Sequence, residues 1–115
     1  KYIKAMKECH RLTRGEGIDK VLSDYSCCSL VAPTISTPWA IDLLNGDNRL
    51  GGSSCLAAVS GYPSVTLPMG YVSGLPVGLS FIGGAWEDHS IIDLAYAFEQ
   101  TSLVRQPPGQ PARFL

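Results

Sequence analysis

A short stretch of glycine and serine near the middle of the chain has residue types that could do chemistry. It reads Gly51-Gly52-Ser53-Ser54. A glycine pair before a helix could present backbone N–H groups to an anion, and a serine could serve as a nucleophile. The stretch lacks the lysine of a phosphate-binding loop and does not match the Gly-x-Ser-x-Gly nucleophile elbow. The pattern alone therefore predicts a helix N-cap, with a small hydrolase using Ser53 or Ser54 as an alternative.

The two histidines are the other residues that could act as acids or bases. His10 and His89 lie near opposite ends of the chain. Either could be combined on paper with a serine and with Asp42, Asp47 or Asp93, but no spacing selects one such triad. We therefore expect neither histidine to be catalytic. No histidine, cysteine and carboxylate cluster has metal-ligand spacing, so we expect no metal ion and no cofactor.

The composition limits the kind of fold and the kind of partner. The chain has 115 residues, enough for one domain, and is 45% apolar. Only 17% of its residues are charged, against roughly 25% in an ordinary soluble domain. This low fraction predicts a surface partly covered by other protein. A net charge of −1 argues against nucleic acid and anionic membrane as partners, and the apolar runs are too short to span a bilayer.

The cysteines indicate a compartment rather than a site. The four are Cys9, Cys27, Cys28 and Cys55, and they show no zinc-binding spacing. Neighbouring Cys27 and Cys28 cannot easily pair with each other. We expect buried free thiols in a reducing compartment, which favours a cytoplasmic protein.

The apolar pattern divides the chain into helices and short strands. Residues 1–25 are predicted to be helical, as one helix that ends at Gly15 followed by a second short helix. The run 29–32 is continuous and apolar, which is typical of a strand buried on both faces. It leads into a long loop, 33–52, whose apolar residues Trp39 and Ile41 favour a packed conformation.

The second half of the chain has clearer signals. A short helix is expected at 53–60 with Gly61 as its stop, followed by an antiparallel hairpin of strands 64–68 and 77–82. Asp88 is expected to cap a final amphipathic helix, on which Ile91, Leu94, Ala95 and Phe98 share one face. A proline-rich tail follows at 106–115. This order of elements predicts an α/β fold.

Several stretches resemble the C-terminal part of enzymes of the amidase signature family. They are 30–34 (Leu-Val-Ala-Pro-Thr), 57–70, 74–83, 85–86 (Ala-Trp) and 95–100 (Ala-Tyr-Ala-Phe-Glu-Gln). The match runs in order over 17–108. The resemblance implies a large mixed sheet flanked by helices. It also implies that 1–115 is the C-terminal part of an amidase domain, divided into 1–25, 29–52, 53–102 and the tail 106–115.

The same resemblance implies an amidohydrolase that cleaves a carboxamide C–N bond through a Ser–Ser–Lys relay. The relay lies upstream of the matched part, so no catalytic residue is expected in this chain, which should be inactive alone. Its lysines lie in helix-like settings, and the stretch 51–54 only imitates the family's serine motif; the lysines are Lys1, Lys4, Lys7 and Lys20. The chain would complete the sheet and the substrate pocket. The alternative is a free-standing, non-catalytic structural or interaction module derived from an amidase.

The resemblance places the loop 34–54 near the pocket for a small-molecule amide. The predicted substrate-binding residues are Trp39, Asp42, Gly52, Ser53 and Ser54. Two of them have plainer interpretations, since Trp39 could cover the core and Asp42 could belong to a loop turn. The expected protein partner is the upstream portion of the amidase or another copy of this chain.

Overall fold

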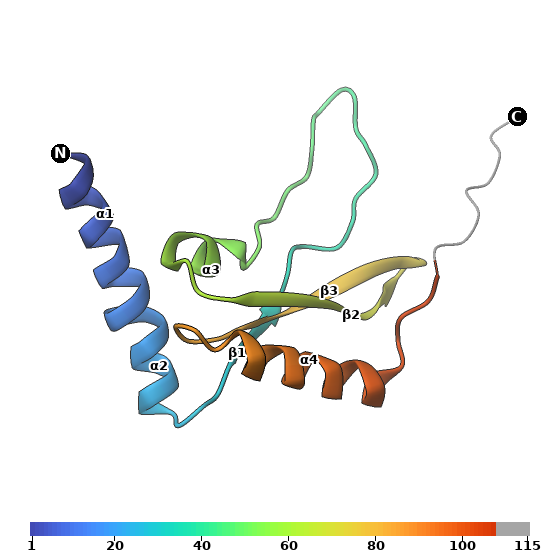
Figure 1. Ribbon diagram of the computed structural model, residues 1–115. Helices are drawn as coiled ribbons and strands as arrows, with labels where there is room; N and C mark the ends of the chain where they lie inside the picture. The colour runs from blue at the N-terminus through green and yellow to red at the C-terminus, as the bar shows by residue number, and fades with distance from the viewer. Residues whose placement is uncertain (108–115) are drawn as a thin grey trace, which may run out of the picture.

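The computed structural model describes residues 1–107 as a small sheet between helices (Figure 1). Helix α4 lies along one face of the sheet, and α3 and the long loop lie on the other side. The elements in chain order are α1 (Tyr2–His10), η1 (Arg11–Ile18), α2 (Asp19–Asp24), β1 (Leu30–Pro33), α3 (Ser54–Ser60), β2 (Ser64–Val72), β3 (Leu75–Ile82) and α4 (Asp88–Ser102). The proline-rich tail predicted at 106–115 falls mostly outside the described residues.

The first three helices form one continuous rod, which we call the N-terminal rod (Figure 1). The backbone stays right-handed helical at both junctions, at Arg11 and at Asp19. Between them the Asp19 N–H bonds the carbonyl of Arg14, five residues back, which is the pattern of a π-helix. The predicted end at Gly15 and the predicted pair of helices are therefore wrong. A glycine inside a helix costs only about 1 kcal/mol, which the neighbouring turns absorb.

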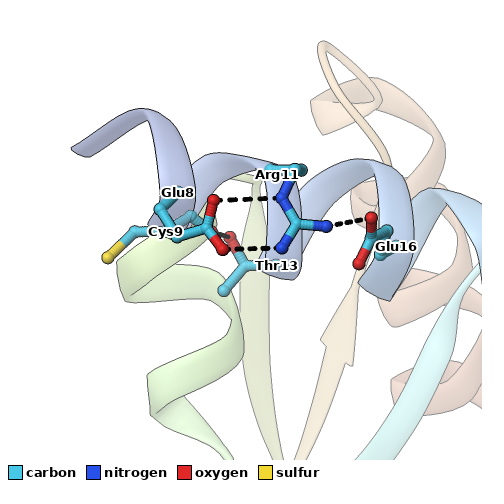
Figure 2. A network of polar contacts seen from close by, with 5 residues as sticks. All are labelled: Glu8, Cys9, Arg11, Thr13 and Glu16. Carbon is cyan, nitrogen blue, oxygen red and sulfur yellow. Dashed lines mark hydrogen bonds and ion pairs between the residues drawn. The ribbon is translucent and has the colours of Figure 1, made fainter. Parts of the chain in front are cut away.

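One exposed side of the rod carries an ion-pair network (Figure 2). The Arg11 guanidinium bonds both carboxylate oxygens of Glu8, one turn back, and the carboxylate of Glu16, five residues ahead. Its hydrogen bonds hold the pKa of the Glu8 carboxyl below its usual range. Thr13 donates from its hydroxyl to the carbonyl of Cys9 at 2.7 Å. Because these groups are exposed, the network orients side chains and adds little to stability.

The sheet has three antiparallel strands in the order β1-β3-β2. Strands β2 and β3 form the predicted hairpin, with longer strands than the alternation indicated. Its two-residue turn has positive φ at both positions, 51° at Ser73 and 77° at Gly74. This turn matches the twist of the strands, and glycine enters the left-handed region without a steric penalty. The register shifts between Pro68 and Gly70, which marks a bulge.

Strand β1 lies at an edge of this sheet. Its residues alternate between half-buried and exposed, and the Val31 side chain is 54% exposed. The prediction that 29–32 is buried on both faces is wrong for this chain, because β1 pairs only with β3 among residues 1–107. The α/β fold class is confirmed.

The core lies between α4 and the sheet. Ile91 and Ala95 are buried on the predicted apolar face of the helix. The Phe98 ring meets the Phe81 ring of β3 with centroids 5.7 Å apart and planes tilted by 59°. Such tilted pairs are favoured by the charge distribution of aromatic rings. The apolar period of three and four residues thus correctly identified the face of α4 that packs.

The ends of two helices show how far local signals reach. Helix α3 begins after Ser53 and ends at Gly61, which is left-handed with φ 71°, as predicted. Helix α4 has Glu87 at its N-cap, with no side-chain cap, so the predicted capping role of Asp88 is wrong. Asp88 instead lies in the first turn, where its charge suits the helix dipole.

The loop 34–53 extends away from the sheet (Figure 1). A single bridge between Ile35 and Gly52 closes its base. Its apolar side chains are open to solvent, with Ile41 81%, Leu43 93% and Leu44 94% exposed. The predicted packed conformation is therefore wrong within this chain.

The chain exposes more surface than a compact domain of its size. Its accessible area is 8841 Å², against about 6,100 Å² expected for a compact protein of this mass. The radius of gyration is 17.3 Å, against about 13 Å for a compact chain of the same length. Among residues 1–107, no helix combines the length and the apolar character needed to cross a bilayer.

Candidate functional site

The base of loop 34–53 holds the glycine–serine stretch against the end of β1. The Ser53 N–H donates to the Thr34 carbonyl at 3.0 Å, and the Ser36 N–H donates to the Gly51 carbonyl at 3.2 Å. A Cβ at Gly52 would lie 2.6 Å from that Thr34 oxygen, so only glycine allows this approach. The two strands of the loop base enclose a hollow of about 450 Å³. Its lining residues are Pro33, Ile35, Ser36, Leu50, Gly51, Gly52 and Ser53.

Neither serine of this stretch is placed as an activated nucleophile. The Ser53 hydroxyl is 3.5 Å from the Thr34 carbonyl, which accepts a hydrogen bond but is too weak a base to remove the proton. Ser54 is exposed in the first turn of α3. In the part of the chain that the structure describes, no lysine or histidine hydrogen bonds either hydroxyl. The geometry thus favours a wall or a binding surface over a nucleophile.

The histidines lie away from this stretch. His89 Nδ1 lies 3.2 Å from Asp93 Oδ2 on the outer side of α4, where the His89 side chain is 91% exposed. His10 Nε2 lies 3.5 Å from an Arg14 nitrogen on the N-terminal rod. These contacts leave both histidines without a serine partner, as expected from the sequence.

The tip of loop 34–53 is organised around Asp42. One carboxylate oxygen accepts the N–H groups of Leu44 and Asn45, each at 2.9 Å, and the other accepts the Asn45 side-chain amide at 2.8 Å. The Gly46 N–H adds a bond to the Asp42 carbonyl at 3.0 Å. These donors hold the pKa of the Asp42 carboxyl below its ordinary value, because they stabilise the charged form. The loop-turn interpretation of Asp42 therefore matches the structure.

Trp39 lies beside this turn. Its indole N–H donates to Asp47 Oδ1 at 3.3 Å, so the two halves of the loop are tied across their gap. Trp39, Asp42 and Asp47 share a hollow of about 520 Å³ at the loop tip. Its aromatic and acidic walls could accept a polar or cationic group of a ligand.

The structure thus separates the predicted substrate-binding residues into two places. Gly52 and Ser53 line the hollow at the loop base, with Ser54 following at the start of α3. Trp39 and Asp42 line the hollow at the loop tip. Their joint action on one ligand remains a prediction.

Sequence reasoning missed a cluster of hydroxyl groups next to the loop base. Ser80 Oγ lies 2.8 Å from Thr34 Oγ1 and 3.0 Å from Thr66 Oγ1, and Ser80 is only 4% exposed. The three residues come from β3, β2 and the segment after β1. Thr66 and Ser80 are paired in the hairpin register, so alternation on the two strands could have indicated their contact. Nearby, the Ser36 hydroxyl is buried with no partner among the described residues.

Comparison with known proteins gives this arrangement a family. No family model matches the chain. A probable amidase of Arabidopsis thaliana is 45% identical over 56 residues, which cover 48% of this chain and 11% of the relative. One component of the glutamyl-tRNA(Gln) amidotransferase of a Synechococcus strain is 36% identical over 91 residues, covering 72% of this chain and 18% of the relative. The chain therefore spans under a fifth of the length of these relatives.

Solved structures agree with the sequence relatives. A peptide amidase in complex with the competitive inhibitor chymostatin has a TM-score of 0.87 and 47% identity, over 94% of this chain and 22% of that one. The native peptide amidase of Stenotrophomonas maltophilia has a TM-score of 0.82 and 44% identity, over 94% and 21%. The fold described above is thus a portion of an amidase-type α/β protein. The chain belongs to the amidase signature family, and it corresponds to a C-terminal part of its members.

Proposed function

We propose that this chain is the C-terminal segment of an amidohydrolase that cleaves a carboxamide C–N bond. The observation that carries the proposal is the match to peptide amidase over 94% of this chain and only 22% of that enzyme. The remaining portion would hold the Ser–Ser–Lys relay, in which a neutral lysine removes a proton through one serine from the other. We refer below to the relay portion and this chain together as the complete protein, and we place it in the cytoplasm.

In this proposal the chain supplies a wall of the substrate pocket and part of the sheet. The base of loop 34–53 offers backbone groups at Gly52 and Ser53 to an amide ligand. The loop tip offers the Trp39 ring and the carboxylate of Asp42, held in place by its turn. Backbone amides and a fixed carboxylate suit a ligand that both accepts and donates hydrogen bonds, as a carboxamide does.

The excess surface of the chain supports a covered position in a larger protein. The accessible area exceeds the compact expectation by roughly 2,700 Å², and a stable interface takes about 800 Å² from each partner. The exposed apolar side chains of the rod and the loop are part of this surface, as are the unpaired backbone groups at the outer edge of β1. We expect the relay portion to cover them, and the separated chain to associate with itself or with the relay portion.

The test is ammonia release from a C-terminally amidated dipeptide by the complete protein and by this chain alone. We expect the complete protein to hydrolyse the substrate and the separated chain to be inert. A control variant with both His10→Gln and His89→Gln should keep turnover within about tenfold of the unchanged protein, because a general base contributes ~10²–10⁴.

Two outcomes would overturn the proposal. Hydrolysis by the 115-residue chain, with labelling of Ser53 or Ser54 by a fluorophosphonate, would restore the small-hydrolase alternative. A separated chain that sediments as a sharply melting monomer, binds no apolar dye and belongs to an inert complete protein would instead favour the free-standing module.

A further inference from the structure

The N-terminal rod grips the turn between α3 and β2 through one arginine. Arg14 Nε donates to the carbonyl of Ser60 at 2.6 Å, a short bond from a charged donor. Ser60 is fully buried at the last position of α3, where helix carbonyls lack partners within the helix. The Ser60 hydroxyl in turn accepts the Tyr62 N–H at 3.1 Å. Arg14 therefore satisfies a buried acceptor at the end of α3.

The same arginine and a nearby acid hold the side chain of Tyr62 from two sides. The Arg14 guanidinium carbon lies 5.4 Å from the centroid of the Tyr62 ring, within cation–π range. The Tyr62 hydroxyl donates to Asp19 Oδ2 at 2.9 Å. Burial, followed by the bond to Asp19, raises the pKa of the Tyr62 phenol, so the hydroxyl keeps its proton and remains a donor. Within the described residues, no carboxylate pairs with Arg14, which leaves its charge to the carbonyl and the ring.

The π-helical segment explains why both groups reach Tyr62. In an α-helix, residues five apart point about 140° away from each other, given 100° per residue. In η1 the bond from the Asp19 N–H to the Arg14 carbonyl brings these two residues one above the other. The Arg11–Glu16 ion pair in Figure 2 has the same spacing of five residues on the outer side. The wide turns thus convert a spacing unsuited to pairing into a shared face.

A glycine makes this wide turn possible. A Cβ at Gly17 would lie 2.7 Å from the backbone oxygen of Leu12, closer than side-chain carbons are found. Gly15 has open space at the same position and is not constrained in this way. The Gly17 backbone therefore permits the geometry that aligns Arg14 with Asp19, and Gly15 offers a control position on the same segment.

The gripped turn lies at the opposite end of α3 from the candidate site. Helix α3 has seven residues, which corresponds to a length of about 10 Å. Ser60 is its last residue, and Ser53 precedes its first. A short helix moves as a rigid body, so a displacement at Ser60 also displaces Ser53 and the adjoining Gly52. Position along the chain thus links the Arg14 contacts to the hollow at the loop base.

We infer that Arg14, aligned by the π-helical turn, is a positioning residue for the pocket wall formed by Gly52 and Ser53. The inference rests on the proposed amidase function. Arg14 does not line the hollow at the loop base, so its effect on a ligand passes through Ser60 and α3. Loss of the clamp formed by Arg14, Asp19, Ser60 and Tyr62 should weaken substrate binding and leave the upstream relay intact.

The first experiment measures steady-state kinetics of the complete protein with an amidated dipeptide. Arg14→Gln should raise KM by about three- to tenfold with kcat within about twofold, the signature of lost uniform binding. Arg14→Lys keeps the charge without the planar fork and should recover part of the loss. Arg11→Gln breaks the exposed network on the outer side of the same helix and should leave KM unchanged. An unchanged KM in Arg14→Gln, or an equal rise in Arg11→Gln, would overturn the inference.

A second experiment covers the case in which Arg14→Gln folds poorly. Tyr62→Phe keeps the ring and loses the bond to Asp19, and Gly17→Ala strains the wide turn while Gly15→Ala does not. We expect Tyr62→Phe and Gly17→Ala to raise KM in the same direction as Arg14→Gln, and Gly15→Ala to leave it unchanged. A Gly17→Ala protein with a KM equal to that of Gly15→Ala would refute the alignment by the π-helical turn.

A double-variant cycle separates the clamp from the catalytic proposal. If Arg14 and Tyr62 act as one unit, the variant with both changes should lose less melting temperature than the sum of the single losses. Additive losses would show that no clamp exists. If the complete protein has no amidase activity, the proposed function and the positioning role both fail, while a non-additive cycle would still establish the contact.

Discussion

The α4–sheet unit and loop 34–53 differ in where their apolar side chains find partners. In the α4–sheet unit, Ile91 is 2% and Ile82 is 1% exposed, and the Phe81 and Phe98 rings meet in the core. In the loop, Leu43 and Leu44 are each more than 90% exposed although the turn that contains them is well hydrogen-bonded. The first region is held by burial, and the second by polar contacts near one carboxylate.

This difference teaches that order and burial are separate properties of a segment. The loop tip has a defined conformation because Asp42 satisfies three donors within its own turn. It gains no hydrophobic stabilisation from this chain, because its leucines face solvent. A segment with a fixed shape and uncovered leucines is suited to meet a surface supplied from outside the chain, as the proposed relay portion would do.

The largest expected effect comes from emptying the core of the α4–sheet unit. In the complete protein, Ile91→Ala should lower the free energy of unfolding by about 2–5 kcal/mol, because it leaves a cavity. Ile92→Ala, at the next position and 59% exposed in this chain, is the matched control and should cost clearly less. Denaturant unfolding measures both. Equal losses would show that the two sides of α4 are equally covered, which would break the comparison.

A smaller effect is expected from filling a tight space in the sheet. A Cβ at Gly78 would lie 2.7 Å from Thr34 Oγ1 and 2.9 Å from Thr66 Cγ2, inside the hydroxyl cluster. Gly78→Val should therefore destabilise by about 1–3 kcal/mol through overpacking.

Gly70 provides the control for this substitution. It lies on β2 with nothing within 4 Å of an added Cβ, so Gly70→Val should have little effect on thermal unfolding. An unchanged melting temperature in Gly78→Val would mean that the hydroxyl cluster can open without cost. In that case, the sheet would resemble the loop in tolerance rather than the core.

The smallest effect on stability, and the sharpest in location, concerns the loop tip at low pH. The pKa of Asp42 is lowered from 3.8 in the folded chain, so its contribution is fully present above that value. It is lost as the pH falls through the lowered folded value. We expect the amide signals of Leu44 and Asn45 to shift in nuclear magnetic resonance spectra below about pH 4, with those of α4 unaffected.

Asp42→Asn is the control for this titration. It should abolish the pH dependence of the two loop amides, because an amide does not titrate in this range. Signals of α4 that shift together with those of the loop would contradict the independence of the two regions. Persistence of the loop shift in Asp42→Asn would assign it to another group.

Much of the fold could be predicted because its signals lie within a few residues of one another. The period of α4 identified Ile91 and Ala95 as buried, and the glycine at position 74 marked the hairpin turn. The N-cap of α4 was misplaced by one residue, since Glu87 and Asp88 are both acceptable near a helix start. Gly15 was taken as a helix end because glycine is typical of that position, but the rod continues through it.

The candidate site was predicted less completely. Gly52 and Ser53 lie together as expected from their adjacency, but Trp39 and Asp42 occupy a separate hollow. No local signal indicates how far a loop of this length projects, because that depends on what packs against it. The exposure of Val31 in β1 has the same origin, since a strand is buried on both faces only where a second layer is present.

The sequence by itself determined the family, the order of the helices and strands, the packing face of α4 and the chemistry available in loop 34–53. Only the tertiary structure decided that Arg14 meets Ser60 and that Thr34 meets Ser80, each pair 46 residues apart. It also decided that the rod has a π-helical segment with Arg14 and Asp19 on one face. The physical reason is that helix periods and turns depend on neighbouring residues, whereas these contacts depend on how distant segments pack once the chain has closed.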